Sequence, residues 1–249
     1  MEGASVTISI VSHGQGQLVR ELLADLTRLR PSGIAKLVLT VNLPEELPAE
    51  IGQLPFEVVT LRNPCPLGFG ANHNRAFRHC ATSWFAILNP DLRLTTDTLM
   101  SALQAVDPCD GLLSPRILEV EGTAADATRR LITPLQLLRR QLGWREPASG
   151  PEVDWLAGMC LLVRSTAFAA VGGFDERFYL YLEDADLCLR LQLAGWRIRQ
   201  IEDAAVIHAA QRASHRSFRY LRWHVASLIK HWTSGAYWRY LATRRRVSR

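Results

Sequence analysis

The sequence lacks the signatures of several well-marked protein classes. Its five cysteines are scattered and include no CxxC pair, so we expect reduced thiols rather than a zinc site or a disulfide framework. No run of 18 apolar residues occurs, so no transmembrane helix is expected. The first residues show neither a basic region nor a cleavable apolar stretch, so we expect no secretory signal. With 48% hydrophobic and 21% charged residues, the composition is that of an ordinary globular protein.

Acidic residues are missing from the end of the chain. No Asp or Glu follows Asp203, whereas residues 212–249 contain ten of the 29 Lys and Arg residues. The rest of the chain carries 19 basic and 24 acidic residues. A mildly acidic body with a basic tail predicts that the tail faces something anionic.

The first 90 residues alternate between short apolar strands and helices. Strands are predicted at 6–11, 36–41, 57–61 and 84–88, with helices after the first and the third. This alternation indicates a parallel, doubly wound α/β sheet. Ligands of such sheets bind at the carboxyl ends of the strands. We therefore expect one cleft to be lined by four residues at or just beyond strand ends, namely His13, Asn42, Arg62 and Asp91.

The second half of the chain mixes strands and helices. Strands are predicted at 112–118, 159–163 and 196–200, and helices near 135–142 and over 183–194. No internal repeat or low-complexity linker is present, which favours one catalytic domain followed by a tail.

Two acidic motifs could carry chemistry. Asn89-Pro90-Asp91 follows a buried strand, where a carboxylate could bind a divalent cation that bridges to a diphosphate. The same three residues also suit a simple turn. Glu183 and Asp184 begin a helix, where they could favour the helix N-terminus or could supply a general base.

Two further features have both a structural and a functional interpretation. His208 is either a packed histidine or a second metal ligand beside Asp91. Gly68 lies in a glycine-containing loop that opens a helix and could approach a phosphate, although a plain turn explains it equally well. The glycine fingerprint of dinucleotide-binding folds and the Walker pattern are both absent.

Taken in order, these segments resemble the inverting family 2 glycosyltransferases with the GT-A fold. The likeness extends over roughly residues 5–230 and is nearest to the rhamnosyltransferase-like branch that builds bacterial cell-surface polysaccharides. Its most specific stretches are residues 153–164, 171–178, 181–190 and 194–197, which include Val-Gly-Gly-Phe-Asp-Glu-Arg-Phe and Tyr-Leu-Glu-Asp-Ala-Asp-Leu-Cys-Leu-Arg. The resemblance implies a GT-A catalytic domain over residues 1–211, with a nucleotide-sugar-binding half at 1–110 and an acceptor half at 111–211, followed by a helical tail at 212–249.

The resemblance also implies roles for individual residues. Asp91 matches the last position of the family's metal-binding motif, with Asn89 beside it, and His208 matches a histidine that completes the metal site for Mg²⁺ or Mn²⁺. Asp184 matches the catalytic base and Glu183 its supporting neighbour. The remaining matches concern the donor: His13, Asn42, Arg62 and Gly68 at the nucleotide, and Trp155 and Gly158 at the sugar pocket.

Three departures from the family pattern lie at the nucleotide end. The family usually has Asp before the asparagine that corresponds to Asn42, and here that residue is Val41. The first loop has Ser12-His13-Gly14 in place of Thr-Tyr-Asn, and Pro66 replaces an asparagine. A different nucleotide or weaker donor binding is therefore expected.

The expected partners follow from the resemblance and from the tail. The favoured donor is dTDP-rhamnose, with a UDP-sugar as the other option, and the acceptor is a glycan or a lipid-linked glycan. Apolar residues of the tail recur at helical spacing between basic residues, which favours a helix lying on an anionic membrane surface or one packed on the domain. We expect a cytoplasmic protein, peripheral on the inner face of the cell membrane.

Other classes of function remain open at this point. A catalytically silent relative that only binds a sugar nucleotide or a partner protein is one, because of the missing Asp before Asn42. A nucleic-acid-binding protein is disfavoured because no recognised module is present and the basic excess is confined to one end. A nicotinamide oxidoreductase is disfavoured by the absent glycine fingerprint.

Overall fold

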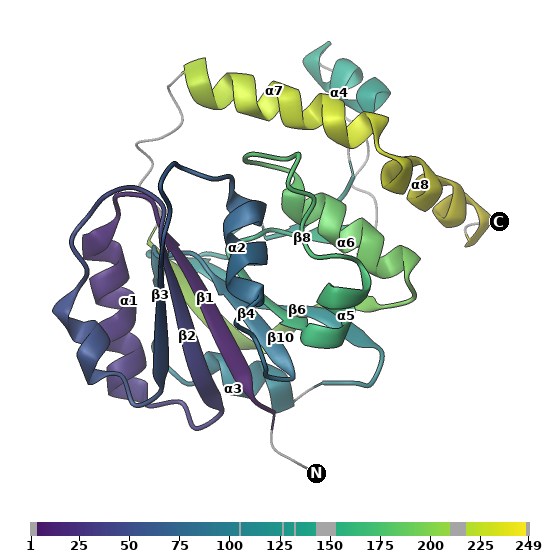
Figure 1. The fold of residues 1–249 in the computed structure, drawn as a ribbon. Helices are drawn as coiled ribbons and strands as arrows, with labels where there is room; N and C mark the ends of the chain where they lie inside the picture. The colour runs from purple at the N-terminus through teal and green to yellow at the C-terminus, as the bar shows by residue number, and fades with distance from the viewer. Residues whose placement is uncertain are drawn as a thin grey trace.

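The computed structural model describes residues 4–104, 106–125, 127–131, 133–142, 153–209 and 218–247. Figure 1 shows a central sheet with helices on both faces and a further layer of helices across one end. The sheet has eight strands in the order β3-β2-β1-β4-β9-β6-β10-β5, and a two-stranded ribbon joins β7 and β8. The strands are β1 Val6–Ser12, β2 Ile34–Val41, β3 Glu57–Arg62, β4 Trp84–Leu88, β5 Leu92–Arg93, β6 Asp110–Glu119, β7 Thr128–Arg129, β8 Trp155–Leu156, β9 Cys160–Arg164 and β10 Arg197–His208.

The helices cover both faces of this sheet and one end of the molecule (Figure 1). They are α1 Gly16–Leu29, η1 Ala49–Gln53, α2 Phe69–Phe77, α3 Thr98–Gln104, α4 Pro134–Gln141, α5 Ser165–Ala170, α6 Glu183–Leu193, α7 Phe218–Thr233 and α8 Gly235–Val247. One core cluster joins the sheet to α1 and α3, and a second joins its other face to α2, α5, α6 and α8. Short helices α3 and α5 are not predicted from the sequence, because six or seven residues are too few to display a helical period.

The first four long strands form the predicted parallel sheet. β1 pairs in parallel with β2 and with β4, and β2 pairs in parallel with β3. All five residues of β4 are buried, as are all but one in β1, as expected for strands covered on both faces. The parallel register brings the ends of β1, β2 and β3 to one edge of the sheet.

The second half makes the sheet mixed. β9 runs antiparallel to both β4 and β6, while β10 is parallel to β6. β10 is longer than the predicted strand at 196–200 because it continues past a bulge between Ile201 and Ala205. Its end pairs with the two residues of β5, which sets His208 opposite Leu92. The fold class is thus a mixed, mostly parallel α/β sheet, as predicted.

The tail forms two helices, and both contact the rest of the chain. In α8, Tyr237 is fully buried in the core cluster that contains α6. Tyr240 and Arg244 both bind the buried carboxylate of Asp154, at 3.0 and 2.7 Å. α8 therefore packs on the domain. α7 lies across the end of the molecule next to α4 (Figure 1) and also contacts the domain, where Ser227 Oγ donates to Leu180 O at 2.8 Å. The predicted boundary at residues 211 and 212 lies outside the described residues.

None of the described helices is both long enough and apolar enough to cross a bilayer.

Candidate functional site

The carboxylate of Asp91 and the imidazole of His208 are in contact. His208 Nε2 lies 3.2 Å from Asp91 Oδ2, and both side chains are mostly buried. The contact arises because Asp91 directly precedes β5, which pairs with the end of β10. A hydrogen bond to Asp91 raises the pKa of His208 against the opposing effect of burial.

This pair suits a divalent cation. Asp91 Oδ1 is buried and has no hydrogen-bond partner among the described residues, so one oxygen is left for a ligand. Carboxylate and imidazole together match the ligand preferences of Mn²⁺, and Mg²⁺ is commonly held by one carboxylate plus substrate phosphates. No group of three or more metal-binding side chains occurs in the described part of the chain, so other ligands would have to come from substrate or water.

Asp184 lies at the start of α6 with both oxygens held by backbone amides. Gly158 N donates to Oδ2 and Ala185 N donates to Oδ1, each at 2.8 Å. Burial raises the pKa of Asp184, while the two amides and the positive charge of Arg129 partly oppose this. The result is an oriented carboxylate that accepts a proton more readily than an exposed aspartate.

Glu183 is buried next to Asp184 and has fewer partners. Its Oε2 makes no hydrogen bond among the described residues. Burial and the adjacent Asp184 charge together raise its pKa well above the usual range. Glu183 therefore keeps its proton to higher pH than an exposed glutamate does.

The pair of Glu183 and Asp184 directly follows a turn with a strained backbone. Tyr181 and Leu182 both have left-handed backbone conformations, with φ of 73° and 66°. Such conformations cost about 1–3 kcal/mol for non-glycine residues and cluster at functional sites. The turn is also a point of close packing, because a Cβ on Gly68 would lie 2.6 Å from the carbonyl oxygen of Tyr179. Gly68 thus has a packing role, and no phosphate contact is needed to explain it.

One loop joins the Asp91 region to Asp184. Asn89 N donates to Met159 O at 3.0 Å, and Gly158, the residue before, donates its N–H to Asp184. The loop from β8 to β9 therefore lies between the two acidic motifs, and two of the predicted positions, Asn89 and Gly158, mark its contacts. The structure brings Asp91 and His208 together and ties Asp184 to the same loop.

At the end predicted to bind the nucleotide, Asn42 is buried and its side chain makes hydrogen bonds to several protein groups. Asn42 Nδ2 lies 2.9 Å from His13 Nδ1 and 3.0 Å from Leu67 O. Asn42 Oδ1 accepts from Asn63 Nδ2 at 2.7 Å and from Leu67 N at 2.9 Å. His13 and Asn42, both predicted to lie at the nucleotide, are thus in contact, and the hydrogen bonds of Asn42 hold three loops together.

The Arg62 side chain is not part of the hydrogen-bond network around Asn42. It is exposed and donates to the carbonyl oxygen of Glu45 at 3.3 Å. The structure therefore does not place Arg62 against His13 or Asn42, although all three follow strands that end at the same edge of the sheet.

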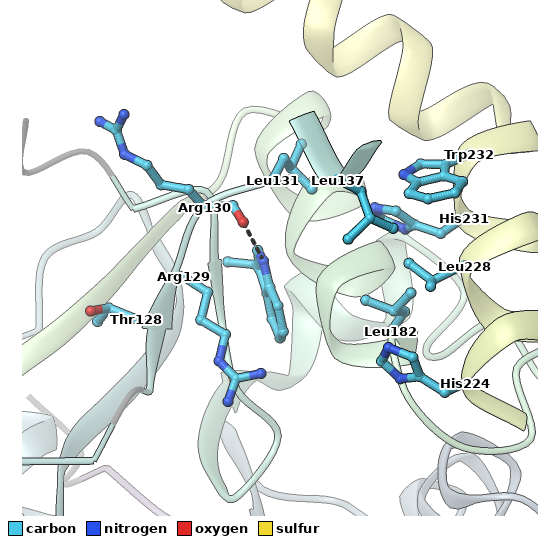
Figure 2. A pocket seen from close by; sticks show the side chains of 11 residues that line it. Thr128, Arg129, Arg130, Leu131, Leu137, Leu182, His224, Leu228, His231 and Trp232 are labelled. Atoms are coloured by element: carbon cyan, nitrogen blue, oxygen red, sulfur yellow. Dashed lines mark hydrogen bonds between the residues drawn. The ribbon is translucent and has the colours of Figure 1, made fainter. Parts of the chain in front are cut away.

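A cavity of about 390 Å³ lies beside the acidic pair, between the β7–β8 ribbon and α7 (Figure 2). Trp155 lines it, as does Leu182 of the strained turn. Trp155 Nε1 donates to Arg130 O at 3.3 Å, and the guanidinium of Arg129 lies 5.1 Å from the centroid of the Trp155 ring. The predicted sugar-pocket residue thus borders a real cavity.

Sequence reasoning missed several residues of this region. Arg129, which acts electrostatically on Asp184, is one of many arginines in a polar segment, and nothing local distinguishes it. Two tail histidines, His224 and His231, line the cavity although they are far from Asp184 in sequence. For His231, the only indication in the sequence was its position in a helix with regularly spaced apolar residues.

Comparison with known proteins agrees with this architecture. The chain matches the family described as "Glycosyltransferase like family 2" over residues 6–226. It is 29% identical to Rhamnosyltransferase WbbL of Escherichia coli K12, covering 98% of this chain and 95% of the relative. It is also 29% identical to an N-acetylglucosaminyl-diphospho-decaprenol L-rhamnosyltransferase of Mycobacterium tuberculosis, covering 80% of this chain and 74% of the relative.

Solved structures show the same fold at low identity. The mannosyltransferase PcManGT of Pyrobaculum calidifontis, in complex with GDP-Man and Mn²⁺, aligns with a TM-score of 0.63 at 15% identity, over 89% of this chain and 61% of that one. S. aureus TarS with UDP-GlcNAc aligns with a TM-score of 0.64 at 14% identity, over 93% and 67%. With its family match over most of the sequence, this chain belongs to glycosyltransferase family 2 and is a glycosyltransferase of the GT-A fold.

Proposed function

We propose that this glycosyltransferase moves a deoxysugar, with rhamnose favoured, from a nucleotide diphosphate to an acceptor hydroxyl and inverts the anomeric configuration. The observation that carries the proposal is the Asp184 carboxylate, held by two backbone amides next to the loop that borders Asn89. The two relatives named as rhamnosyltransferases support the choice of sugar. The preferred donor is dTDP-rhamnose, and a UDP-sugar is the second candidate.

In the proposed reaction, Asp184 is the general base. Its carboxylate takes the proton of the acceptor hydroxyl while that oxygen forms a bond to the anomeric carbon. The bond from the anomeric carbon to the diphosphate oxygen breaks, and its electron pair leaves with the nucleotide diphosphate. Because the oxygen attacks the face opposite the leaving group, the configuration inverts. A positioned base of this kind contributes about 10²–10⁴ in rate.

Asp91 and His208 would hold Mg²⁺ or Mn²⁺ on the leaving-group side. A cation held there would supply positive charge to offset the negative charge that develops on the diphosphate. The unpartnered Oδ1 of Asp91 supports this assignment. Asn42 and His13 support the loops that would surround the nucleotide, through the hydrogen bonds that join β1, β2 and the segment before α2.

The donor and the stereochemistry are tested together. We expect dTDP-rhamnose with Mn²⁺ to raise the melting temperature more than UDP-sugars or GDP-sugars do, because a ligand of the folded state stabilises by mass action. Product anomers are then assigned by NMR. Retention of configuration would contradict the mechanism, and donor binding without any transfer would favour the catalytically silent relative.

We also propose that the protein acts on a lipid-linked acceptor from the inner membrane surface. On α7, three apolar side chains four residues apart are exposed: Leu221 by 57%, Val225 by 46% and Ile229 by 56%. Leu135 and Leu138 of the neighbouring α4 are also exposed. The basic excess of the tail complements anionic lipid headgroups.

Vesicle co-sedimentation tests this location. We expect binding to vesicles that contain anionic lipid and weaker binding to neutral ones, with L221S/V225S/I229S reducing both. Equal binding of the triple variant and the parent would contradict docking through α7. Because the changed side chains are exposed, the melting temperature should stay the same and serves as the folding control.

A further inference from the structure

The cavity between α7 and the β7–β8 ribbon is separate from the proposed metal site. Neither Asp91 nor His208 lines it, whereas Leu182, two residues before Asp184, does. Its walls come from four parts of the chain: the β7–β8 ribbon, α4, the strained turn and α7 (Figure 2). Its volume of about 390 Å³ falls within the range of small-molecule sites.

Most of the cavity wall is apolar. Leu137 of α4 faces Leu228 and Trp232 of α7 across it, and Leu131 and Leu182 complete this side. The next residues outward on the same two helices include the exposed Leu138 and Ile229. Apolar surface therefore continues from the outside of α4 and α7 into the cavity, which suits an apolar chain arriving from a bilayer.

Polar groups are concentrated at two places in the wall. The guanidinium of Arg129 lies beside Trp155 and acts on Asp184. His231 is only 3% exposed, and neither of its ring nitrogens has a hydrogen-bond partner among the described residues. Burial lowers the pKa of His231 to about 4, so one ring nitrogen carries a proton to donate at neutral pH. A buried polar group without a partner is costly unless a ligand satisfies it.

We propose that this cavity binds the prenyl-diphosphate end of a lipid-linked acceptor. The leucines and Trp232 contact the first isoprenoid units, and Arg129 and His231 contact the anionic diphosphate. That arrangement directs the sugar attached to the diphosphate toward Asp184. The inference rests on the proposed transferase function and its lipid-linked acceptor, and adds to them the place where the lipid end binds.

A binding experiment without sugar tests the site. The full chain is titrated by calorimetry with farnesyl diphosphate below its micellar concentration, and separately with farnesol and with inorganic diphosphate. We expect farnesyl diphosphate to bind at least ~10-fold more tightly than either fragment, because it alone fills both parts of the cavity. Equal affinity for farnesol would point to a purely apolar groove, and equal affinity for diphosphate to an anion site, and either result would overturn the proposal.

Two tryptophan substitutions on one helix provide a matched pair. L228W fills the cavity and should weaken the binding of farnesyl diphosphate at least ~10-fold, whereas T233W, at an exposed position at the end of α7, should not change it. H231F should remove the preference for farnesyl diphosphate over farnesol, and H231Q should restore part of it. Unchanged affinity in L228W would overturn the proposal.

One further measurement needs no variant. A photoactivatable farnesyl diphosphate analogue is cross-linked to the parent chain, and the labelled peptides are identified by mass spectrometry. Label within 128–137 and 218–233 is expected, and label confined to other segments would overturn the site. Donor binding is measured by thermal shift on the same preparations. If the transferase proposal is wrong, donor binding is absent; if only the cavity proposal is wrong, the donor binds but farnesyl diphosphate does not bind in the cavity.

Discussion

The Asn42 side chain at the predicted nucleotide end and the acidic side chains at the proposed reacting end differ in how their buried polar atoms are satisfied. At the nucleotide end, the Asn42 side chain binds His13, Leu67 and Asn63, so its hydrogen bonds are made within the protein. At the reacting end, Asp91 Oδ1 and Glu183 Oε2 are buried and have no partner among the described residues.

This difference indicates which end is organised before substrate arrives and which is completed by it. Satisfied buried networks make a region rigid, whereas unsatisfied polar atoms destabilise it until a ligand binds. The missing carboxylate at Val41 belongs to the first region, where internal amide bonds hold the loops instead. The strained turn at Tyr181 and Leu182 belongs to the second.

The largest effect is expected at Asp184. D184N keeps an oxygen for the Gly158 amide but cannot take a proton, so turnover should fall at least ~10²-fold while donor affinity is retained. Initial rates and donor titration by thermal shift measure the two quantities. E202Q, an exposed carboxylate on β10, is the control. Donor affinity lost together with turnover would show that Asp184 is not the base.

Asn42 should be the position that most affects the stability of the nucleotide end. N42A removes hydrogen bonds to three partners and leaves buried groups unsatisfied, so the free energy of unfolding should fall by about 2 kcal/mol. N42D keeps the acceptor oxygen and should lose less. Urea denaturation measures both variants. If N42A were as stable as the parent, the contrast between a preorganised end and an incomplete end would not hold.

A smaller effect is expected when Asp91 is changed. D91N removes the charged oxygen that faces the proposed cation, so the Mn²⁺ concentration for half-maximal donor binding should rise at least ~10-fold. Thermal shift with donor, before and after EDTA treatment, measures this change. Identical Mn²⁺ dependence in the variant and the parent would exclude Asp91 as a ligand.

The last prediction concerns Glu183 and depends on pH. Its folded-state pKa is raised above the ordinary value of 4.5, so above pH 4.5 the unfolded chain releases a proton that the folded chain keeps. Stability of the parent therefore falls as pH rises toward the folded pKa, by at most about 1.4 kcal/mol per pH unit. E183Q lacks this dependence and should gain melting temperature relative to the parent between pH 5 and pH 8. Parallel pH curves for the two proteins would show that Glu183 ionises freely.

Many of the strands and helices could be predicted from the local pattern of apolar residues. Apolar runs of five or six residues located β1, β2 and β4, since buried parallel strands need continuous apolar sequence. β3 lies at the edge of the sheet and is mostly not buried, and its Val58, Val59 and Leu61 were enough to locate it. The position of Asp91 after β4, and of Glu183 and Asp184 at the start of α6, followed from the same pattern. The specific stretches between residues 153 and 197 indicated the family, which the comparisons confirm.

Contacts between distant segments could not be predicted in this way. Asp91 meets His208 only because two residues of β5 pair with the end of a bulged β10. Asn42 turns inward because Leu67 and Asn63 are present to bind it. His231 becomes part of a cavity only when α7 lies across α4 and the β7–β8 ribbon. The local periodicity of apolar residues indicates which face of a helix or strand is buried. The residues that pack against that face depend on how the whole chain folds. The sequence therefore determined the helices and strands, and the tertiary structure decided which side chains meet in the site.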